Sequence, residues 1–299
     1  MKRAITFIII TCLLNWALAV AFMLAGFKFS GSQAIIFGAI YMLIPMLVAL
    51  FLQKLIYKEK VKDNLLISFK LNKWFLVAWL LIPVANILVI FVALLIPGVT
   101  ISPEMGGLIE KMSTSLPPDQ LEKLTEKVHN LPPFVPALIT LVQGLIAGIT
   151  INAVFAFGEE LGWRGFLLHQ FKKLHFMKAS LITGFVWGIW HFPIILMGHN
   201  YPAHPIAGVF MMTLFCILLS PIFAYITLKS KSVIAAAIMH GSLNGTVGLS
   251  MMLLVGGSDL TIGITGISGF ALLTLLNVVI FLIDKYWTKE NIWSKTIES

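Results

Sequence analysis

Charged residues are unusually scarce in this chain. Asp, Glu, Lys and Arg make up only 11% of its 299 residues, whereas 59% are hydrophobic. A water-soluble domain carries about a quarter charged residues, because these side chains cover its surface. The composition therefore excludes an ordinary soluble protein and predicts that lipid surrounds most of the chain.

Cysteine is rare, and a common protease motif and internal repeats are absent. The two cysteines, Cys12 and Cys216, fall in apolar stretches, which predicts buried thiols rather than a disulfide or a metal site. The His-Glu-x-x-His spacing of common zinc proteases does not occur. No internal repeat is visible, although transporters of this size are often built from inverted repeats.

Long apolar runs dominate what is present. A membrane-spanning helix needs about 20 mostly apolar residues, and eight stretches qualify: Ala4–Gly26, Ser32–Leu52, Phe75–Pro97, Phe134–Phe157, Ala179–Gly198, Ile206–Leu228, Val233–Gly256 and Thr261–Ile283. The first is too long for a signal peptide and reads as a membrane helix. We therefore predict an all-α, polytopic membrane protein, a bundle of about eight transmembrane helices that forms one transmembrane domain over residues 1–299.

The basic residues are distributed unevenly between the predicted loops. With eight spans, both termini share one side, and only four of the 21 basic residues fall on the other side: Lys28, Lys111, Lys123 and Lys127. Such a bias predicts a multi-pass integral membrane protein with both termini cytoplasmic. It also explains the net charge of +8 through contact with anionic lipid, without a nucleic-acid partner.

One long loop, 98–133, is predicted on the outer side. Within it four apolar residues recur at helical spacing: Leu121, Leu124, Val128 and Leu131. Prolines at 117–118 and 132–133 bound the pattern. This predicts a short amphipathic helix that rests on the outer surface. A role as a lid is the alternative.

Polar residues interrupt the apolar segments in three places: Gly158–Gly165, Trp187–Pro193 and His240–Gly245. Ionisable groups inside a membrane are costly and usually functional. The members of each pair Glu160 and Arg164, Trp187 and His191, and His240 and Asn244 are four residues apart, so they share a helix face. We expect all three motifs to converge on one cavity that opens toward the cytoplasm.

The depth of Glu159 has two interpretations. If its span stops at Phe157, the carboxylate lies at the inner surface. If the apolar residues up to Phe171 are also in the membrane, it lies up to about 20 Å deep. A shared site requires the deeper placement.

The residue types suit peptide-bond hydrolysis. That reaction needs an activated water, a proton donor for the leaving amine and stabilisation of an oxyanion. A buried glutamate can act as the base, and histidine and asparagine can donate hydrogen bonds. A zinc ion held by histidine and glutamate would also activate water. These residue types alone leave both mechanisms open.

The order and spacing of the motifs resemble a known family. Glu159-Glu160-x-x-x-Arg164, an aromatic residue four before His191, and His240-x-x-x-Asn244 resemble the three motifs of the CAAX-protease and bacteriocin-processing family. The run 159–165 is especially similar to that of bacterial members, which suggests a bacterial cell membrane. The resemblance implies a catalytic core over residues 134–256. Trp187 departs from the family's usual phenylalanine.

The resemblance also implies roles for individual residues. Glu159 would be the general base, assisted by His191, and Glu160 would pair with Arg164. His240 and Asn244 would form the oxyanion site. Trp163 and Trp187 would wall the substrate site.

The implied activity is that of an intramembrane endopeptidase. Its substrate would be a hydrophobic or lipid-anchored peptide or protein. A glutamate-dependent reaction without a cofactor is favoured, and a divalent metal such as zinc is the alternative.

Other interpretations stay open from the residues alone. Glu160 and Arg164 could form a purely structural ion pair, since charges in a membrane generally pair. A proton-coupled transporter, or a non-catalytic peptide-binding or immunity protein, would use the same polar residues differently. The remaining histidines near loops, which include His199 and His204, are expected to be solvated.

Overall fold

The computed structural model describes residues 1–113 and 116–298. In these residues the α-helices are α1 (Lys2–Leu24), α2 (Gly31–Leu50), α3 (Lys73–Ala93), α4 (Gly106–Met112), α5 (Pro118–His129), α6 (Val135–Ile149), α7 (Ile151–Glu160), α8 (Leu168–Gln170), α9 (Phe176–Trp190), α10 (Phe192–Leu196), α11 (Pro205–Ser230), α12 (Val233–Thr246), α13 (Leu249–Leu253) and α14 (Ile267–Leu282). Three π-helical segments extend them, at Phe51–Ile56, Leu161–Leu167 and Ile283–Trp287. A 3-10 turn spans Ile292–Ser294. Two short strands, β1 (Thr100–Ile101) and β2 (Leu254–Val255), pair antiparallel.

The helices long enough to cross a membrane are fewer than the eight apolar stretches predicted. Among the described residues six qualify: Lys2–Leu24, Gly31–Ile56, Lys73–Ala93, Pro205–Ser230, Val233–Leu253 and Ile267–Trp287. A seventh results if α6 and the helical run Ile151–Gln170, which meet at a 51° bend, count as one span. The stretch 179–198 instead forms α9 and α10, which are shorter. The protein is an all-α, polytopic membrane protein with six or seven such spans.

The outward-facing side chains of the bundle are apolar. Ile35, Phe91 and Phe210 are 74%, 63% and 74% exposed. Such large apolar side chains would be unfavourable in water and are suited to lipid. A set of polar side chains, which includes Glu160 and Arg164, is instead buried between the helices, where these side chains can pair with one another.

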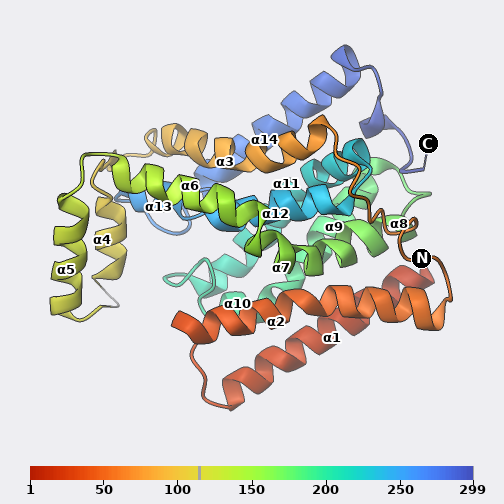
Figure 1. Cartoon of the computed structure of the whole chain (residues 1–299), viewed down its shortest axis with the longest axis horizontal. Coiled ribbons are helices and arrows are strands. Elements are labelled where there is room, and N and C mark those ends of the chain that lie inside the picture. Colours follow the sequence, from red (N-terminus) through yellow and green to blue (C-terminus); the bar gives the residue numbers. More distant parts are fainter. Residues whose placement is uncertain (114–115, 299) are drawn as a thin grey trace.

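The two ends of the bundle differ (Figure 1). Both chain termini lie at one end, and α4 and α5 project from the other. The loop 98–133 contains β1, α4 and α5, so it has a second helix besides the amphipathic one that the sequence pattern predicted. On α5 the side chain of Val128 is buried. Strand β1 joins this loop to β2, which follows α13.

Glycines allow α12 to lie against α6 and α7 at the centre of the bundle. A Cβ atom on Gly241 would lie 2.7 Å from the backbone nitrogen of Ala153, and one on Gly148 would lie 2.6 Å from the Ser242 hydroxyl. Small residues of this kind let membrane helices approach backbone to backbone. The close approach brings His240 on α12 to the carboxyl end of α7.

Candidate active site

The first motif lies where α7 changes into a π-helix. Glu159 and Glu160 are the last residues of α7, and the π-helical segment Leu161–Leu167 follows directly. Segments of this type occur frequently at functional sites. Because the helical run continues to Gln170, Glu159 lies inside an apolar helical segment rather than at its end. The deeper of the two placements requires such a continuous helical run, and the depth itself stays a prediction.

Gly158 fixes this segment against α2. A Cβ atom at Gly158 would lie 2.6 Å from the carbonyl oxygen of Met42. A larger residue would therefore push α7 away from α2. The contact holds the following Glu159 beside the part of α2 that carries Tyr41.

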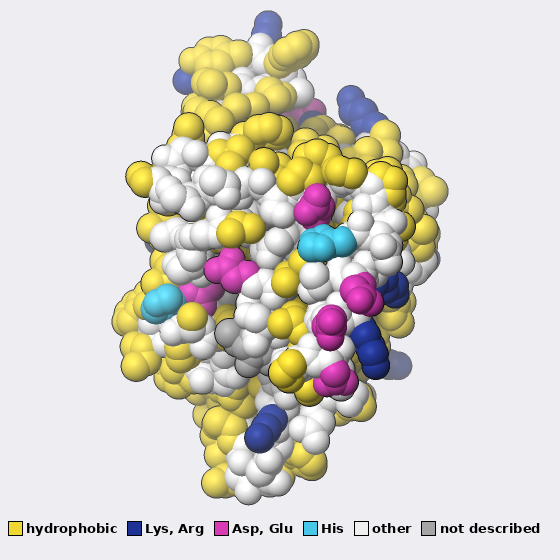
Figure 2. Space-filling view, turned by 90° about the vertical axis from the view of Figure 1, so that its left-hand side faces the viewer, with side chains coloured by type: hydrophobic (Ala, Val, Ile, Leu, Met, Phe, Trp, Pro, Cys, Tyr) yellow, Lys and Arg dark blue, Asp and Glu magenta, His cyan; other side chains and the backbone are white. Residues whose placement is uncertain are grey.

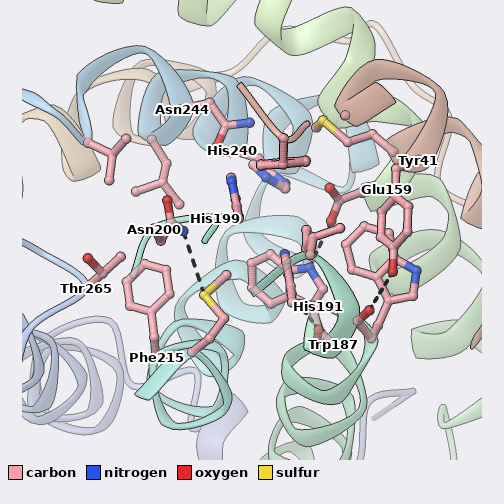
Figure 3. Close-up of a pocket in the computed structure, with 18 residues that line it drawn as sticks. Tyr41, Glu159, Trp187, His191, His199, Asn200, Phe215, His240, Asn244 and Thr265 are labelled. Carbon is pink, nitrogen blue, oxygen red and sulfur yellow. Dashed lines mark hydrogen bonds between the residues drawn. The ribbon is translucent and has the colours of Figure 1, made fainter. Parts of the chain in front are cut away.

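The motif residues meet around a cavity of about 220 Å³. Four of the six predicted catalytic residues line it (Figure 3): Glu159, His191, His240 and Asn244. Trp187 also lines it, as the sequence predicted for a wall residue. These residues come from α7, α9, the α9–α10 junction and α12, so the fold joins helices that are distant in the sequence.

Trp187 links Glu159 to His191. Its indole N–H donates to Oε2 of Glu159 at 2.8 Å, and its carbonyl oxygen lies 2.7 Å from Nδ1 of His191. A carbonyl only accepts, so Nδ1 of His191 carries the proton, and in the neutral ring Nε2 is an acceptor. Oε1 of Glu159 accepts no hydrogen bond from the described residues. Oε1 of Glu159 and Nε2 of His191 are thus two acceptors available at the same cavity.

Glu160 lies behind the cavity and links Arg164 to His240. Its carboxylate is completely buried, 3.1 Å from the Arg164 guanidinium, and its Oε1 lies 2.8 Å from Nδ1 of His240. The guanidinium lies 4.3 Å from the ring centre of Trp187 and 4.6 Å from that of Phe223. The bridging carboxylate orients the His240 ring.

Three predicted site residues are not among those that line the cavity. Glu160 and Arg164 lie behind it, where Glu160 contacts His240 and Arg164 contacts Trp187. Trp163, predicted as a wall of the substrate site, is not among the residues that line the cavity. It is fully buried and packs edge-on against Trp190 and Phe7. An indole next to a motif can pack inward or face the cavity, and sequence spacing does not distinguish these positions.

His199, which was expected to be solvated, lines the cavity together with Tyr41. Its ring packs edge-on against Phe29, with ring centres 5.5 Å apart. Burial lowers the pKa of His199 to about 4. A histidine in a loop has no helical periodicity to indicate its direction, so only the course of the chain after α10 reveals this position.

A metal centre would need several ligands that converge. In the described residues no group of three or more His, Cys, Asp or Glu side chains is arranged to hold a metal ion. The cavity histidines are instead oriented by the carbonyl of Trp187 and by Glu160. This donor arrangement does not fit a protein-held zinc site. We therefore derive no step through a metal.

Comparisons with known proteins agree with the geometry. The sequence pattern of the family described as type II CAAX prenyl endopeptidase Rce1-like matches residues 133–246, which contain all three motifs. CAAX prenyl protease 2 of Methanococcus maripaludis is 31% identical over 260 residues, which cover 83% of this chain and 84% of that protein. The similarity thus extends over most of both chains, beyond the motifs themselves. The chain belongs to the CAAX-protease and bacteriocin-processing family and is a multi-pass integral membrane protein.

Proposed function

We propose that the protein is an intramembrane endopeptidase in which Glu159 activates the attacking water. The observation that carries this proposal is the position of Glu159. Among the described residues it is the only carboxylate that lines the active cavity, and one of its oxygens is held by Trp187. A base must be near the water and correctly oriented, and the indole hydrogen bond supplies the orientation.

The water would lie between Glu159 and Nε2 of His191. Glu159 takes one proton of the water as its oxygen attacks the carbonyl carbon of the scissile bond. When the C–N bond breaks, Glu159 returns the proton to the departing amine. His191 accepts a hydrogen bond from the water and positions it, while the Trp187 carbonyl fixes its ring.

His240 and Asn244 would stabilise the negative oxygen of the tetrahedral intermediate. His240 gives Nδ1–H to Glu160 and can donate from Nε2 when it is doubly protonated. Asn244 lies one helical turn further along α12 and lines the cavity. Loss of one such donor costs about 10²–10³ in kcat in well-studied enzymes. Arg164 balances the charge of Glu160 and is a positioning residue.

The substrate would be a lipid-anchored or hydrophobic protein. The name of the relative, CAAX prenyl protease 2, refers to a protease for prenylated CAAX proteins. We take this class as the first substrate to test. The suitable probe is a farnesylated peptide that ends in cysteine, two aliphatic residues and a variable residue.

The test compares the wild type with Glu159→Gln in detergent or liposomes. Mass spectrometry of the farnesylated peptide should find a shorter product with the wild type and a rate lower by about 10²–10⁴-fold with the variant. The matched control is Asp284→Asn, which changes another buried carboxylate that does not line the cavity. Equal cleavage by wild type and Glu159→Gln would overturn the proposed role of Glu159.

A non-catalytic peptide-binding protein is the second candidate, because the cavity would suit binding alone. It predicts that Glu159→Gln holds the peptide as well as the wild type and that neither protein cleaves it. A proton-coupled transporter predicts proton flux through wild-type liposomes that stops with Glu159→Gln. Peptide cleavage by the wild type decides against both.

A further inference from the structure

A hydrogen-bonded backbone carbonyl lies directly beside His191. Helix α9 ends at Trp190, and the carbonyl oxygen of Trp190 accepts a hydrogen bond from the hydroxyl group of Tyr41 at 2.8 Å. The indole N–H of Trp16 donates to the same oxygen at 3.3 Å. Because His191 is the next residue, both hydrogen bonds act on the peptide unit that joins Trp190 to His191.

The two donors come from helices that carry none of the three motifs. Trp16 lies on α1 and Tyr41 lies on α2, and both are outside the residues 133–246 that match the family pattern. Tyr41 nevertheless lines the active cavity together with His191 (Figure 3). The apolar runs of α1 and α2 predicted only membrane spans, so these contacts give the two helices a further role.

We propose that Trp16 and Tyr41 form a clamp on the Trp190 carbonyl and are positioning residues for His191. This inference rests on the proposed function, in which Nε2 of His191 holds the attacking water. The clamp fixes the backbone from which the His191 ring projects. Helices α1 and α2 therefore set the direction of that ring, although the proposed mechanism assigns no step to either helix.

The end of α9 is a place where such a clamp is needed. The last carbonyls of a helix have no partner within it, and side chains, water or ligands must satisfy them. Pro193 has no N–H, so it cannot form the helical hydrogen bond to the carbonyl of Ile189 four residues earlier. The helix accordingly breaks between α9 and α10, with His191 at the junction. The clamp supplies a partner at this break and fixes the course of the chain through His191.

Aromatic packing holds the same group of residues together. The ring centre of Tyr41 lies 4.6 Å from that of Trp190, and the Trp190 ring meets the His191 ring edge-on with centres 4.7 Å apart. Tyr41 and Trp190 are both buried. A hydrogen bond away from water is electrostatically stronger than one in water. The buried clamp is therefore suited to hold the junction in one position.

A third polar side chain fixes the clamp itself. Pro45 lies inside α2 and has no N–H for the carbonyl of Tyr41, which is four residues earlier. Nδ2 of Asn15 on α1 donates to this carbonyl oxygen at 2.8 Å, and Asn15 is fully buried. The proline thus leaves an acceptor that α1 satisfies. The resulting contact ties α1 to α2 at the residue that carries the clamp hydroxyl.

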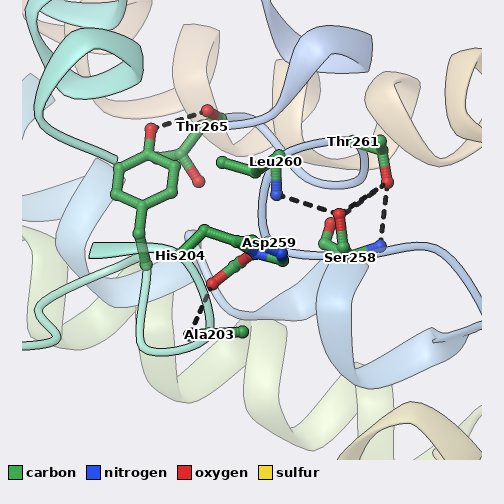
Figure 4. A network of polar contacts seen from close by, with 8 residues as sticks. Ala203, His204, Ser258, Asp259, Leu260, Thr261 and Thr265 are labelled. Carbon is green, nitrogen blue, oxygen red and sulfur yellow. Dashed lines mark hydrogen bonds and ion pairs between the residues drawn. The ribbon is translucent and has the colours of Figure 1, made fainter. Parts of the chain in front are cut away.

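The chain after α10 has a separate anchor. Asp259 accepts from the backbone N–H of Ala203 at 2.9 Å, and its other oxygen lies 2.6 Å from Nδ1 of His204 (Figure 4). The side chain of His204 is 44% exposed, so water can compete for this contact. Figure 2 shows the end of the molecule that carries α4 and α5, where acidic and histidine side chains also reach the surface. We therefore assign the positioning of His191 to the buried clamp, and this exposed anchor provides a comparison.

Kinetics of Tyr41→Phe test the clamp with the farnesylated peptide. The change removes the hydroxyl group and keeps the ring against Trp190. Loss of one neutral hydrogen bond corresponds to a fall in kcat of about threefold to tenfold, and KM should stay within about twofold because substrate contacts are kept. The matched control is Thr11→Val, which removes a buried hydroxyl group of α1 that has no hydrogen-bond partner in the described residues. An unchanged kcat in Tyr41→Phe, or an equal loss in Thr11→Val, would overturn the proposal.

Two further variants separate positioning from general stability. In a His191→Gln background, Tyr41→Phe should have almost no additional effect on kcat, because the group that it positions is gone. The same fold-loss in both backgrounds would mean that Tyr41 acts independently of His191. Asp259→Asn, which weakens the exposed anchor, should lower kcat less than Tyr41→Phe does. The reverse order would assign the positioning to that anchor and overturn the clamp.

Nuclear magnetic resonance reads the His191 ring without turnover. In protein labelled with ¹⁵N-histidine, the signal that His191→Gln removes belongs to His191. The wild type should show one tautomer with the proton on Nδ1, because that nitrogen faces the Trp187 carbonyl. Tyr41→Phe should broaden this signal or mix the tautomers, whereas Thr11→Val should not. An unchanged signal in Tyr41→Phe overturns the clamp, and since no cleavage is needed, this failure is distinguishable from failure of the proposed proteolysis.

Discussion

The indole nitrogen of Trp187 donates a 2.8 Å hydrogen bond to Glu159, although 28 residues separate the two in the sequence. The same tryptophan holds His191 through its carbonyl oxygen. One residue thus orients both groups that are proposed to act on the water. The position where the family usually has phenylalanine therefore carries a polar contact that phenylalanine cannot make.

Replacement of Trp187 by phenylalanine tests this contact. The change keeps an aromatic wall and removes the donor to Glu159. A hydrogen bond to a charged group contributes about 1.5–3 kcal/mol, so we expect kcat to fall by about 10- to 100-fold. The matched control is Trp190→Phe, because the Trp190 indole N–H has no hydrogen-bond partner in the described residues. Equal losses in the two variants would mean that ring size matters and the hydrogen bond does not.

We expect the buried ion pair of Glu160 and Arg164 to stabilise the fold as well as to position His240. Arg164→Met leaves the Glu160 carboxylate buried without its guanidinium, and loss of one partner of a buried ion pair costs about 3–5 kcal/mol. We expect a marked loss of thermal stability in detergent. The double variant Glu160→Gln with Arg164→Met removes both charges and should recover part of the lost thermal stability. A double variant no more stable than Arg164→Met would contradict this coupling.

Chelation tests the choice between glutamate and metal. If Glu159 activates the water without a metal, prolonged treatment with 1,10-phenanthroline followed by gel filtration should leave peptide cleavage unchanged. The non-chelating isomer 1,7-phenanthroline is the control. Loss of activity that zinc restores would show that a metal takes part and that the proposed mechanism is wrong.

Helix packing beside Glu159 can be probed with alanine. A Cβ atom at Gly158 meets the Met42 carbonyl, so Gly158→Ala should cost about 1–3 kcal/mol through overpacking. Gly38, which lies on α2 and lines the active cavity, is the control, because a Cβ there meets no atom within 4 Å. The measurement is the Tm of each purified variant. Similar Tm values for the two variants would refute the close approach of α7 to α2.

The half-buried position of His199 at the cavity predicts a pH effect on stability. Its pKa is lowered from 6.5 to about 4 by burial, so the unfolded chain binds the proton more readily than the folded chain. Stability from this group is fully present above pH 6.5 and is lost as the pH falls toward about 4. His199→Phe should flatten the decline of Tm in that range. His175→Phe, at an exposed histidine, should not change it.

Local spacing was sufficient for much of the site. Glu160 and Arg164 pair, and Trp187 contacts His191, because residues four apart on a helix share a face. The apolar runs likewise predicted the all-α membrane architecture, because the bilayer requires backbone hydrogen bonds to be satisfied within helices. These features depend on neighbours along the chain.

Tertiary packing decided the rest. His240 meets Glu160 across 80 residues because glycines let α12 approach α7, and no local pattern encodes that distance. The position of Trp163 away from the cavity and of His199 within it was decided in the same way. So was a second cavity, which is lined by residues of α4, of the loop 200–203, of the segment 247–254 and of the loop 256–265. The sequence by itself determined which residues can share a helix face, whereas only the three-dimensional packing determined which faces meet.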